Sequence, residues 1–196
     1  ESGQVADVEG AFVAPANLGQ FTVSIPILYY SANMDSNPGW TLESPWAFGA
    51  PAYSGSGVPN SAFTGTNILA TNLSGNYANN LTAKYATTPA INTTGSTSLT
   101  LRFMRWLKKR NQDTTTIQAS SDGQNWVNLW SSSGQVSDTS WQLVQFSLPA
   151  GMAGSPSLRL RWSLSSNSNQ NDIGWNIDDV QLLGDGSLDT SPPVPT

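Results

Sequence analysis

Two adjacent carboxylates stand in the last hydrophobic stretch of the chain, in the segment Gly174-Trp175-Asn176-Ile177-Asp178-Asp179-Val180. In a β-strand, adjacent side chains point to opposite faces of the sheet, so either Asp178 or Asp179 is expected to point inward or sideways. An unpaired charge in that position is costly. A hard cation is one solution, because Ca²⁺ takes about six to eight oxygen ligands from carboxylates, carbonyls and amides. The alternative is an ion pair with an arginine of a neighbouring strand: Arg102, Arg159 or Arg161.

Tryptophan is the second unusual feature, with eight residues among 196. Its ring is amphipathic and stacks on flat apolar surfaces, which the C–H faces of sugars also offer. Most of these rings are expected in the core, because they fall in strand-like patterns beside other apolar residues: Trp40, Trp106, Trp126, Trp162 and Trp175. The remaining tryptophans lie nearer to turns. Together with two tyrosines of a long polar stretch they are the candidates for an exposed, ligand-binding platform: Trp46, Tyr53, Tyr77, Trp130 and Trp141.

A basic cluster is formed by Arg105, Lys108, Lys109 and Arg110, at an expected turn between two strands. Such a cluster could meet an acidic polysaccharide or a phosphate. Clusters of this kind are more often solvated loop tips, or they keep an edge strand from pairing with another chain.

Catalytic side chains are scarce. The chain has no histidine and no cysteine, which excludes Ser-His-Asp triads, cysteine nucleophiles and His- or Cys-ligated zinc. A glycosidase needs two carboxylates roughly 5–9.5 Å apart across a cleft, and nothing in the spacing of Glu43 and the Asp178/Asp179 pair indicates one. A polysaccharide lyase could use Tyr85 with Lys84, but no second matching element accompanies them. We therefore predict that the protein is not an enzyme.

The composition limits the classes of partner that the protein is expected to bind. The formal net charge is −5 and the charged fraction is 11%, whereas a nucleic-acid binder normally presents a basic face. The chain has no run of ~18 apolar residues, so the sequence predicts no membrane-spanning helix. A surface rich in Ser, Thr, Asn, Gly and Gln is typical of many extracellular β-proteins, so we expect a secreted or cell-surface protein.

Short β-rich runs between Gly, Pro, Asn and Ser clusters dominate the chain, and no segment has a sustained helical pattern. Eight strands are predicted, at residues 21–30, 40–48, 98–107, 114–120, 126–131, 141–148, 157–163 and 174–183. The fold class is therefore all-β, a two-sheet antiparallel β-sandwich of the jelly-roll type, spanning residues 21–183. Residues 1–20 are expected to be a linker or edge segment, and the Pro/Ser-rich residues 184–196 an inter-domain linker.

Six short segments resemble, in their order along the chain, the bacterial jelly-roll modules that are similar to MAM domains and to the accessory domains of immune-inhibitor-A-type metalloproteases. They are Asp35-Ser36-Asn37-Pro38-Gly39-Trp40-Thr41 with Trp46–Pro51 behind it, Gly65-Thr66-Asn67, Thr71–Tyr77, Ser120–Gly123 with Trp126, and Gly174–Val180. The resemblance covers about Tyr29 to Leu183. It implies a jelly roll with a structural cation near the first and last strands.

The resemblance also implies ligands for that cation, here expected to be Ca²⁺. Asp178 matches the first aspartate of the final-strand pattern, and Asp35 precedes the Pro-Gly-Trp turn. Asn72 and Asp113 are weaker candidates, and Asp179 adjoins Asp178.

Two functions follow as hypotheses. The first is a monomeric carbohydrate-binding module that holds a linked catalytic domain near polysaccharide; the second is a structural or protein-docking module of an extracellular protease or other hydrolase.

Overall fold

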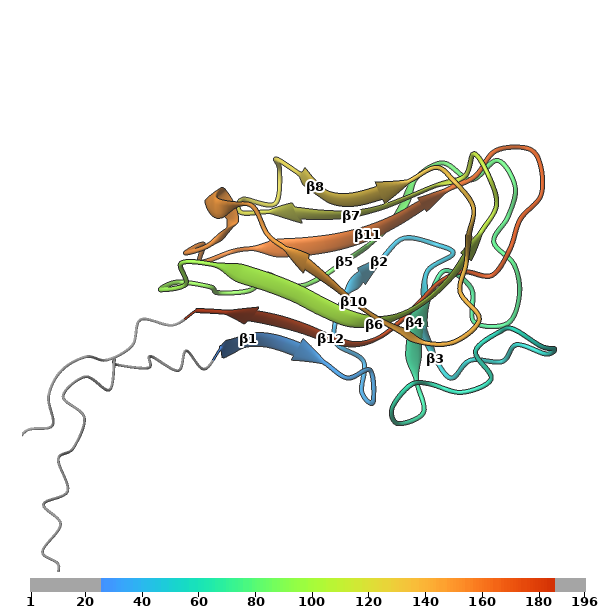
Figure 1. The fold of residues 1–196 in the computed structure, drawn as a ribbon, viewed down its shortest axis with the longest axis horizontal. Helices are drawn as coiled ribbons and strands as arrows, with labels where there is room; N and C mark the ends of the chain where they lie inside the picture. Colours follow the sequence, from blue (N-terminus) through green and yellow to red (C-terminus); the bar gives the residue numbers. More distant parts are fainter. Residues whose placement is uncertain (1–25, 186–196) are drawn as a thin grey trace, which may run out of the picture.

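The computed structural model describes residues 26–185, which form two antiparallel β-sheets packed face to face (Figure 1). Sheet A contains β1 (Ile27–Ala32), β3 (Ala47–Gly49), β4 (Ile68–Ala70), β6 (Leu99–Lys109), β9 (Val136–Ser137), β10 (Gln142–Ser147) and β12 (Gly174–Gly184). Sheet B contains β2 (Thr41–Leu42), β5 (Lys84–Thr87), β7 (Thr114–Ser120), β8 (Val127–Ser132) and β11 (Arg159–Ser165). A single 3-10 turn in the described residues, η1 (Ala150–Met152), links β10 to β11. The predicted all-β sandwich is confirmed.

The strand order shows which segments meet. Sheet A runs β10-β6-β12-β4-β3, with β1 also pairing with β12 and β9 with β6, and sheet B runs β2-β5-β11-β7-β8. Strand β12 therefore lies beside β6 along one edge, while β4 and β1 share its other edge. No helix in residues 26–185 has the length and apolar character needed to span a bilayer.

Six of the eight predicted strands occur within a few residues of their expected bounds. The predicted strand 40–48 is wrong, because Pro45 separates β2 from β3 and the chain crosses from sheet B to sheet A there. The predicted strand 21–30 begins at Ile27 in the described residues, and positions 1–25 and 186–196 lie outside them. Strand β12 continues to Gly184, the first residue assigned to the linker. The short strands β4, β5 and β9 were not predicted, since two to four residues are too few to show a period.

The core lies between the sheets and is built by alternate residues of the long strands. Trp162 of β11 is fully buried, stacks on Trp40 at a ring-centroid distance of 4.9 Å, and meets Phe103 of β6 edge-on at 5.3 Å. Trp175 of β12 is equally buried, and its indole Nε1 donates a hydrogen bond to the Ser163 carbonyl at 2.8 Å. These three tryptophans are core residues, as predicted.

Two other tryptophans predicted for the core lie elsewhere. Trp106 and Trp126 are only half-buried. Trp106 alternates with the buried Leu107, which places it on the outer face of sheet A. Trp126 precedes β8 and lies against Arg161, whose neighbours Leu160 and Trp162 fill the core. The prediction failed because a tryptophan beside apolar residues fits either face of a strand.

Candidate functional site

A β-bulge in β12 decides where the two adjacent aspartates point. Between Asp178 and Gln181 the strand spans one residue more than its partner, since Asp178 pairs with Met104 and Gln181 with Arg102. Asp179 takes a left-handed conformation, with φ of 46°. Because of the extra residue, Ile177 and Val180 both fill the core while neither aspartate does. Of the predicted inward or sideways orientation, the inward one is therefore wrong for both aspartates, while Asp178 is buried outside the core.

Asp178 is nevertheless fully buried, on the outer side of sheet A beneath a covering loop (residues 50–67). Its Oδ2 accepts backbone N–H bonds from Phe63 at 2.9 Å and from Thr64 at 3.2 Å, and its Oδ1 accepts the N–H of Asp179 at 2.8 Å. Burial raises the pKa of Asp178 to about 6, the neighbouring Asp179 adds to the rise, and the three N–H donors oppose it. Within residues 26–185, the carboxylate thus has hydrogen-bond donors but no ion-pair partner.

Asp35 contacts the same loop. The Asn67 side-chain amide donates to the Asp35 carbonyl at 3.3 Å, and Asp35 Oδ1 lies where a Cβ on Gly65 would be. Thr64 Oγ1 donates to Asp179 Oδ1 at 2.8 Å. The segment 63–67 therefore connects Asp35, Asp178 and Asp179, which lie far apart in the sequence. In the part of the chain that the structure describes, no three Asp, Glu, His or Cys side chains converge as a ready metal cluster, so a cation here would need carbonyl and hydroxyl ligands as well.

The arginine alternative is contradicted. Arg102 Nε donates to Gln181, Arg161 Nε to Gln118, and Arg159 Nη1 to the Thr88 carbonyl. Within residues 26–185, the ion pairs join Arg105 to Asp138 and Arg110 to Asp172, and neither involves the bulge.

The structure does not bring Asp113 to this loop. Asp113 is fully buried at the turn between β6 and β7, where Oδ2 accepts the Tyr77 hydroxyl at 2.5 Å and Oδ1 accepts the Asn167 N–H at 2.9 Å. The Lys109 ammonium is buried beside it and donates to the carbonyls of Asp113 (2.8 Å) and Gly134. Burial lowers the pKa of Lys109, and the nearby Asp113 opposes that shift. A lysine thus supplies the positive charge that a metal would bring.

Asn72, the remaining metal candidate, has local partners. Its side-chain amide donates to the Asn76 carbonyl at 3.0 Å and its Oδ1 accepts the Ser74 N–H at 3.1 Å, which closes a turn.

The side chains of the basic cluster also make contacts within the protein. Besides Lys109 and the two ion-paired arginines, Lys108 donates to the Gly57 carbonyl of the covering loop at 3.2 Å. The interpretation of this cluster as a solvated loop tip is wrong.

The expected aromatic platform does not form. Trp46 and Tyr77 are 5% and 1% exposed, so the expectation that they reach solvent is wrong for both. The Trp46 indole donates to the Lys84 carbonyl at 2.9 Å. Burial and the hydrogen bond to Asp113 raise the pKa of Tyr77 well above its usual value. Both rings complete the packing of loops against the core.

The three half-buried candidates occupy separate places. The Tyr53 hydroxyl donates to Asn176 Oδ1 at 2.9 Å and lies against the Asn72 carbonyl, and burial raises its pKa strongly. Trp130 turns inward against Trp175, at a centroid distance of 5.7 Å. Trp141 lies edge-on to Trp106 and Phe63, at 6.0 and 6.4 Å. No two of these three candidates stack on each other, so they do not form one flat surface.

A different aromatic arrangement stands on the outer face of sheet B, opposite to the core. The Arg161 guanidinium lies between two rings, with its Cζ 4.1 Å from the Tyr85 centroid and 3.8 Å from the Trp126 centroid. All three side chains, here named the Arg161 clamp, are partly exposed. Both stacked faces are cation–π contacts, which suit the planar and weakly hydrated guanidinium. Sequence reasoning missed this site, although the alternation Arg159-Leu160-Arg161-Trp162 predicts that Arg161 points away from the core.

Neutral polar side chains surround the clamp. Arg161 Nε donates to Gln118 Oε1 at 2.6 Å, and the Gln118 amide donates in turn to Asn128 Oδ1 at 2.8 Å. In the next row, the hydroxyls of Thr116 and Ser163 lie 2.6 Å apart. This face offers two rings, hydroxyl and amide groups, and a guanidinium with Nη donors that have no partner in residues 26–185. Such a surface suits a ligand rich in hydroxyl groups.

No family model matches the chain. It is 27% identical over 180 residues to Bacillopeptidase F from Bacillus subtilis (strain 168), a match that covers 88% of this chain but only 12% of that protein's length. The specific resemblance to MAM-like or immune-inhibitor-A-type modules therefore stays a prediction.

Solved structures share the fold at low sequence identity. The K1 cleaved adhesin domain of Lys-gingipain from Porphyromonas gingivalis W83 superposes with a TM-score of 0.54 at 14% identity, covering 80% of this chain and 98% of that domain. The CBM22-1 xylan-binding domain from Paenibacillus barcinonensis Xyn10C gives 0.52 at 11% identity, covering 84% and 99%. The CBM22-1-GH10 modules of a Clostridium thermocellum xylanase, complexed with xylohexaose, give 0.53 at 12% identity over 86% of this chain and 30% of theirs. These three structures thus include an adhesin domain, a xylan-binding domain and a CBM22-1 module joined to a GH10 module, and they share the fold of this chain.

Proposed function

We propose that this chain is a non-catalytic accessory module of a secreted multidomain protein, and that it binds polysaccharide on the outer face of sheet B. The observation that carries the proposal is the Arg161 guanidinium held between Tyr85 and Trp126. The fold shared with xylan-binding domains supports the ligand class. The match to a small part of Bacillopeptidase F supports a place beside a linked catalytic domain outside the cell.

The clamp explains how a sugar chain would be held. The two rings fix the guanidinium plane, and the Nε bond to Gln118 fixes its rotation, so that little side-chain entropy remains to be lost on binding. The Nη donors then meet sugar hydroxyls, while ring edges and outer ring faces contact C–H groups. Gln118, Asn128 and Thr116 supply further hydrogen bonds along the sheet, and the buried Ser163 hydroxyl holds that of Thr116.

A non-catalytic role agrees with the side chains available. The chain lacks histidine and cysteine, and Tyr85 and Lys84 are adjacent on β5, so that their side chains leave opposite faces of the strand. The pair weighed for lyase chemistry is therefore not presented on one surface.

We also propose a structural calcium ion at the bulge of β12. Asp178 and Asp35 would be its carboxylate ligands, with Asp179 and Thr64 beside them and loop carbonyls completing the oxygen set. The support is a fully buried carboxylate with a raised pKa and no counter-charge, which a hard cation would supply. The ion would tie the covering loop to the last strand.

The carbohydrate proposal is tested by affinity electrophoresis of the chain in gels with and without neutral and acidic polysaccharides, xylan among them, in the presence of calcium. Retardation by at least one polymer is expected. Trp126→Ala and Arg161→Ala should each reduce it strongly, whereas Trp141→Ala, a change of a half-buried tryptophan on the opposite outer face, should not. Absence of retardation on every polymer, or retardation unaffected by both clamp variants, would refute binding at this face.

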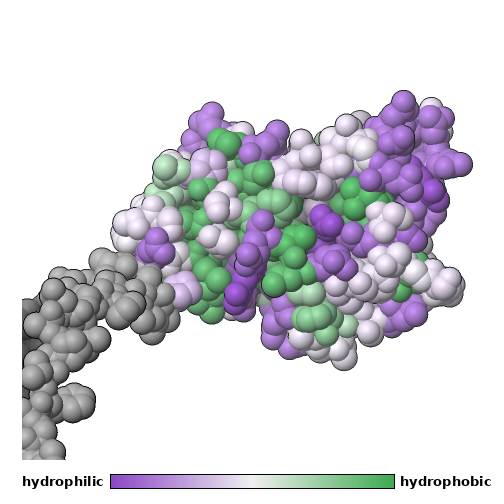
Figure 2. Space-filling view, in the orientation of Figure 1, coloured by the Kyte–Doolittle hydropathy of each residue, from purple (hydrophilic) through white to green (hydrophobic). Residues whose placement is uncertain are grey.

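A second candidate function, protein docking, is favoured by the outer face of sheet A. Leu143 of β10 is 61% exposed and Phe63 of the covering loop 48%. Figure 2 shows hydrophobic side chains gathered over β10 and β6, crossed by a hydrophilic band. Leu143→Ser should leave polysaccharide retardation intact, and it should weaken association with a linked domain if that face docks one.

A further inference from the structure

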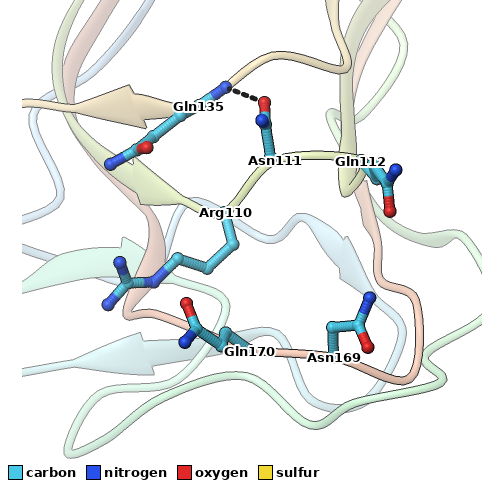
Figure 3. Close-up of a pocket in the computed structure, with 6 residues that line it drawn as sticks. All are labelled: Arg110, Asn111, Gln112, Gln135, Asn169 and Gln170. Carbon is cyan, nitrogen blue, oxygen red and sulfur yellow. Dashed lines mark hydrogen bonds between the residues drawn. The ribbon is translucent and has the colours of Figure 1, made fainter.

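A pocket of about 580 Å³ opens at the end of the sandwich where the turn after β6 faces the loop between β11 and β12 (Figure 3). It is lined by polar side chains: Arg110, Asn111, Gln112, Gln135, Asn169 and Gln170. Five of these six side chains are carboxamides. We name it the amide pocket. It lies apart from the Arg161 clamp and shares no residue with it.

Hydrogen bonds and an ion pair hold the segments that form the amide pocket in place. Asp113 accepts the Asn167 N–H at 2.9 Å, which ties the turn after β6 to the opposite loop. Arg110 Nε lies 3.3 Å from both Asp172 Oδ2 and the Asn171 carbonyl, a second link between the same two segments. Across the pocket, Asn111 Oδ1 accepts the Gln135 N–H at 3.1 Å. Buried Tyr77 and Lys109 hold Asp113 in turn. The backbone of this pocket is therefore organised before any ligand arrives.

Five of the six lining residues are exposed, and their side-chain groups are largely free to bond water or a ligand. In residues 26–185, the carboxamides of Gln135, Asn169 and Gln170 make no hydrogen bond to another protein group. Each carboxamide carries two N–H donors and one carbonyl acceptor in a plane. That combination matches a sugar hydroxyl, which donates and accepts at once, and a pair of neighbouring hydroxyls can meet both ends of one amide.

The charge of the pocket indicates a neutral ligand. No carboxylate lines it, and the charge of the one cation, Arg110, is already compensated by Asp172. The lining residues include no aromatic or aliphatic side chain, so an apolar peptide anchor finds no partner there. Pockets of a few hundred Å³ or more accommodate small ligands.

We infer that the amide pocket is a second saccharide subsite, which takes a neutral, hydroxyl-rich sugar chain end by hydrogen bonding without ring stacking. This inference rests on the proposed carbohydrate function and extends it from the sheet face to the end of the sandwich. The two sites would contact different parts of the ligand. The Arg161 clamp would contact the flat face of a sugar chain, and the amide pocket would contact hydroxyl groups at the end of that sugar chain.

The test is an NMR titration of the ¹⁵N-labelled chain with xylohexaose, cellohexaose and, for comparison, a hexagalacturonate. The expected result is a shift of the side-chain NH₂ signals of Asn169 and Gln170 with a neutral hexaose, and weaker shifts with the acidic one. The double variant Asn169→Ala/Gln170→Ala should lower the affinity for that hexaose about tenfold, because two side chains that bond the ligand are lost. The matched control Asn60→Ala/Gln145→Ala removes two exposed amides elsewhere and should not change it.

Two results separate the failure of this inference from failure of the proposed function. Shifts confined to the residues around Trp126 and Arg161, with full affinity in the Asn169→Ala/Gln170→Ala variant, would overturn the pocket and leave the sheet-face proposal standing. No shift at either site with any hexaose, and no retardation on any polysaccharide, would overturn both. Shifts at the pocket with a soluble peptide library but with none of the sugars would overturn the saccharide assignment in favour of a protein ligand.

Discussion

The outer faces of the two sheets each hold a charged group against the sheet, and they treat it in opposite ways. On sheet A, the covering loop closes over Asp178, which receives three N–H bonds but no positive charge. On sheet B, two aromatic rings enclose the Arg161 guanidinium, and Gln118 takes its Nε proton. The first arrangement has no basic side chain paired with the carboxylate within residues 26–185. The second is complete and still leaves donors for a ligand.

Charge density explains the difference. A carboxylate concentrates its charge on two oxygens and is strongly disfavoured when it is buried, so its pKa rises. A guanidinium spreads its charge over a plane and is weakly hydrated, so aromatic rings can replace water on both faces at low cost. The sheet A face is therefore expected to control stability, and the sheet B face to control binding. The predictions below test that division, beginning with the largest expected effect.

The pH dependence of stability should differ between the unmodified chain and Asp178→Asn. The Asp178 pKa of about 6 in the folded state exceeds its ordinary value of 3.8, so the folded state holds the proton more tightly than the unfolded state. The stability contributed by the protonated form is full below pH 3.8 and is lost as the pH rises through about 6. At about 1.4 kcal/mol per pKa unit, the unmodified chain loses on the order of 2–3 kcal/mol relative to the variant between pH 4 and pH 7.5. Urea unfolding at pH 4 and 7.5 in EDTA measures this; an equal pH dependence in both proteins would contradict it.

Calcium should reverse that loss at neutral pH. An ion that binds only the folded chain adds about 2.7 kcal/mol at a hundredfold excess over its Kd. In a chain of this size that corresponds to a rise in Tm of roughly 5–10 °C. EDTA should remove the rise, and Asp178→Ala should abolish the difference. Asp122→Ala, which removes an exposed hairpin carboxylate, should keep it. If the Tm is the same with calcium and with EDTA, the proposal of a calcium ion at the sheet A face is refuted.

Polysaccharide binding should respond to changes on the sheet B face and not to changes on the sheet A face. Loss of either clamp ring or of the guanidinium should weaken polysaccharide affinity about tenfold, or about 1.4 kcal/mol, because the cation–π stack positions the donors. Isothermal titration of Trp126→Ala, Arg161→Ala and Arg161→Lys measures this. Arg161→Lys should not restore the affinity, since an ammonium has neither the planar shape nor the paired N–H donors of a guanidinium. Full binding by Arg161→Lys would show that charge alone suffices and that the clamp geometry is irrelevant.

The smallest expected effect separates backbone strain from cation binding. Gly65 has φ of 57°, and a Cβ there would overlap Asp35 Oδ1. Gly65→Ala should cost about 1 kcal/mol of stability and displace Asp35, which weakens calcium binding. Gly95 also has a positive φ, of 87°, but nothing within 4 Å of its Cβ position. Gly95→Ala should show a similar loss of stability in urea with unchanged calcium affinity. If both variants bind calcium alike, Asp35 is not a ligand.

The sequence by itself determined the class of the fold and much of its strand pattern. Each long strand is a β-rich run bounded by turn residues, so 98–107, 114–120 and 174–183 could be found without neighbours. Buried positions such as Trp162 and Trp175 follow from the same local signal. The absence of histidine and cysteine excluded whole classes of catalysis by composition alone.

Only the tertiary structure decided which groups meet. The bulge that turns Asp178 and Asp179 away from the core depends on pairing with β6, more than seventy residues earlier. The donors that cover Asp178 come from residues 63 and 64 of the covering loop, and the rings that clamp Arg161 come from β5 and from the residue before β8. Lys109 supplies the positive charge beside Asp113, for which the sequence suggested calcium. Local periodicity tells which side of a strand a residue faces, whereas charge compensation depends on partners that the fold brings together from distant parts of the chain.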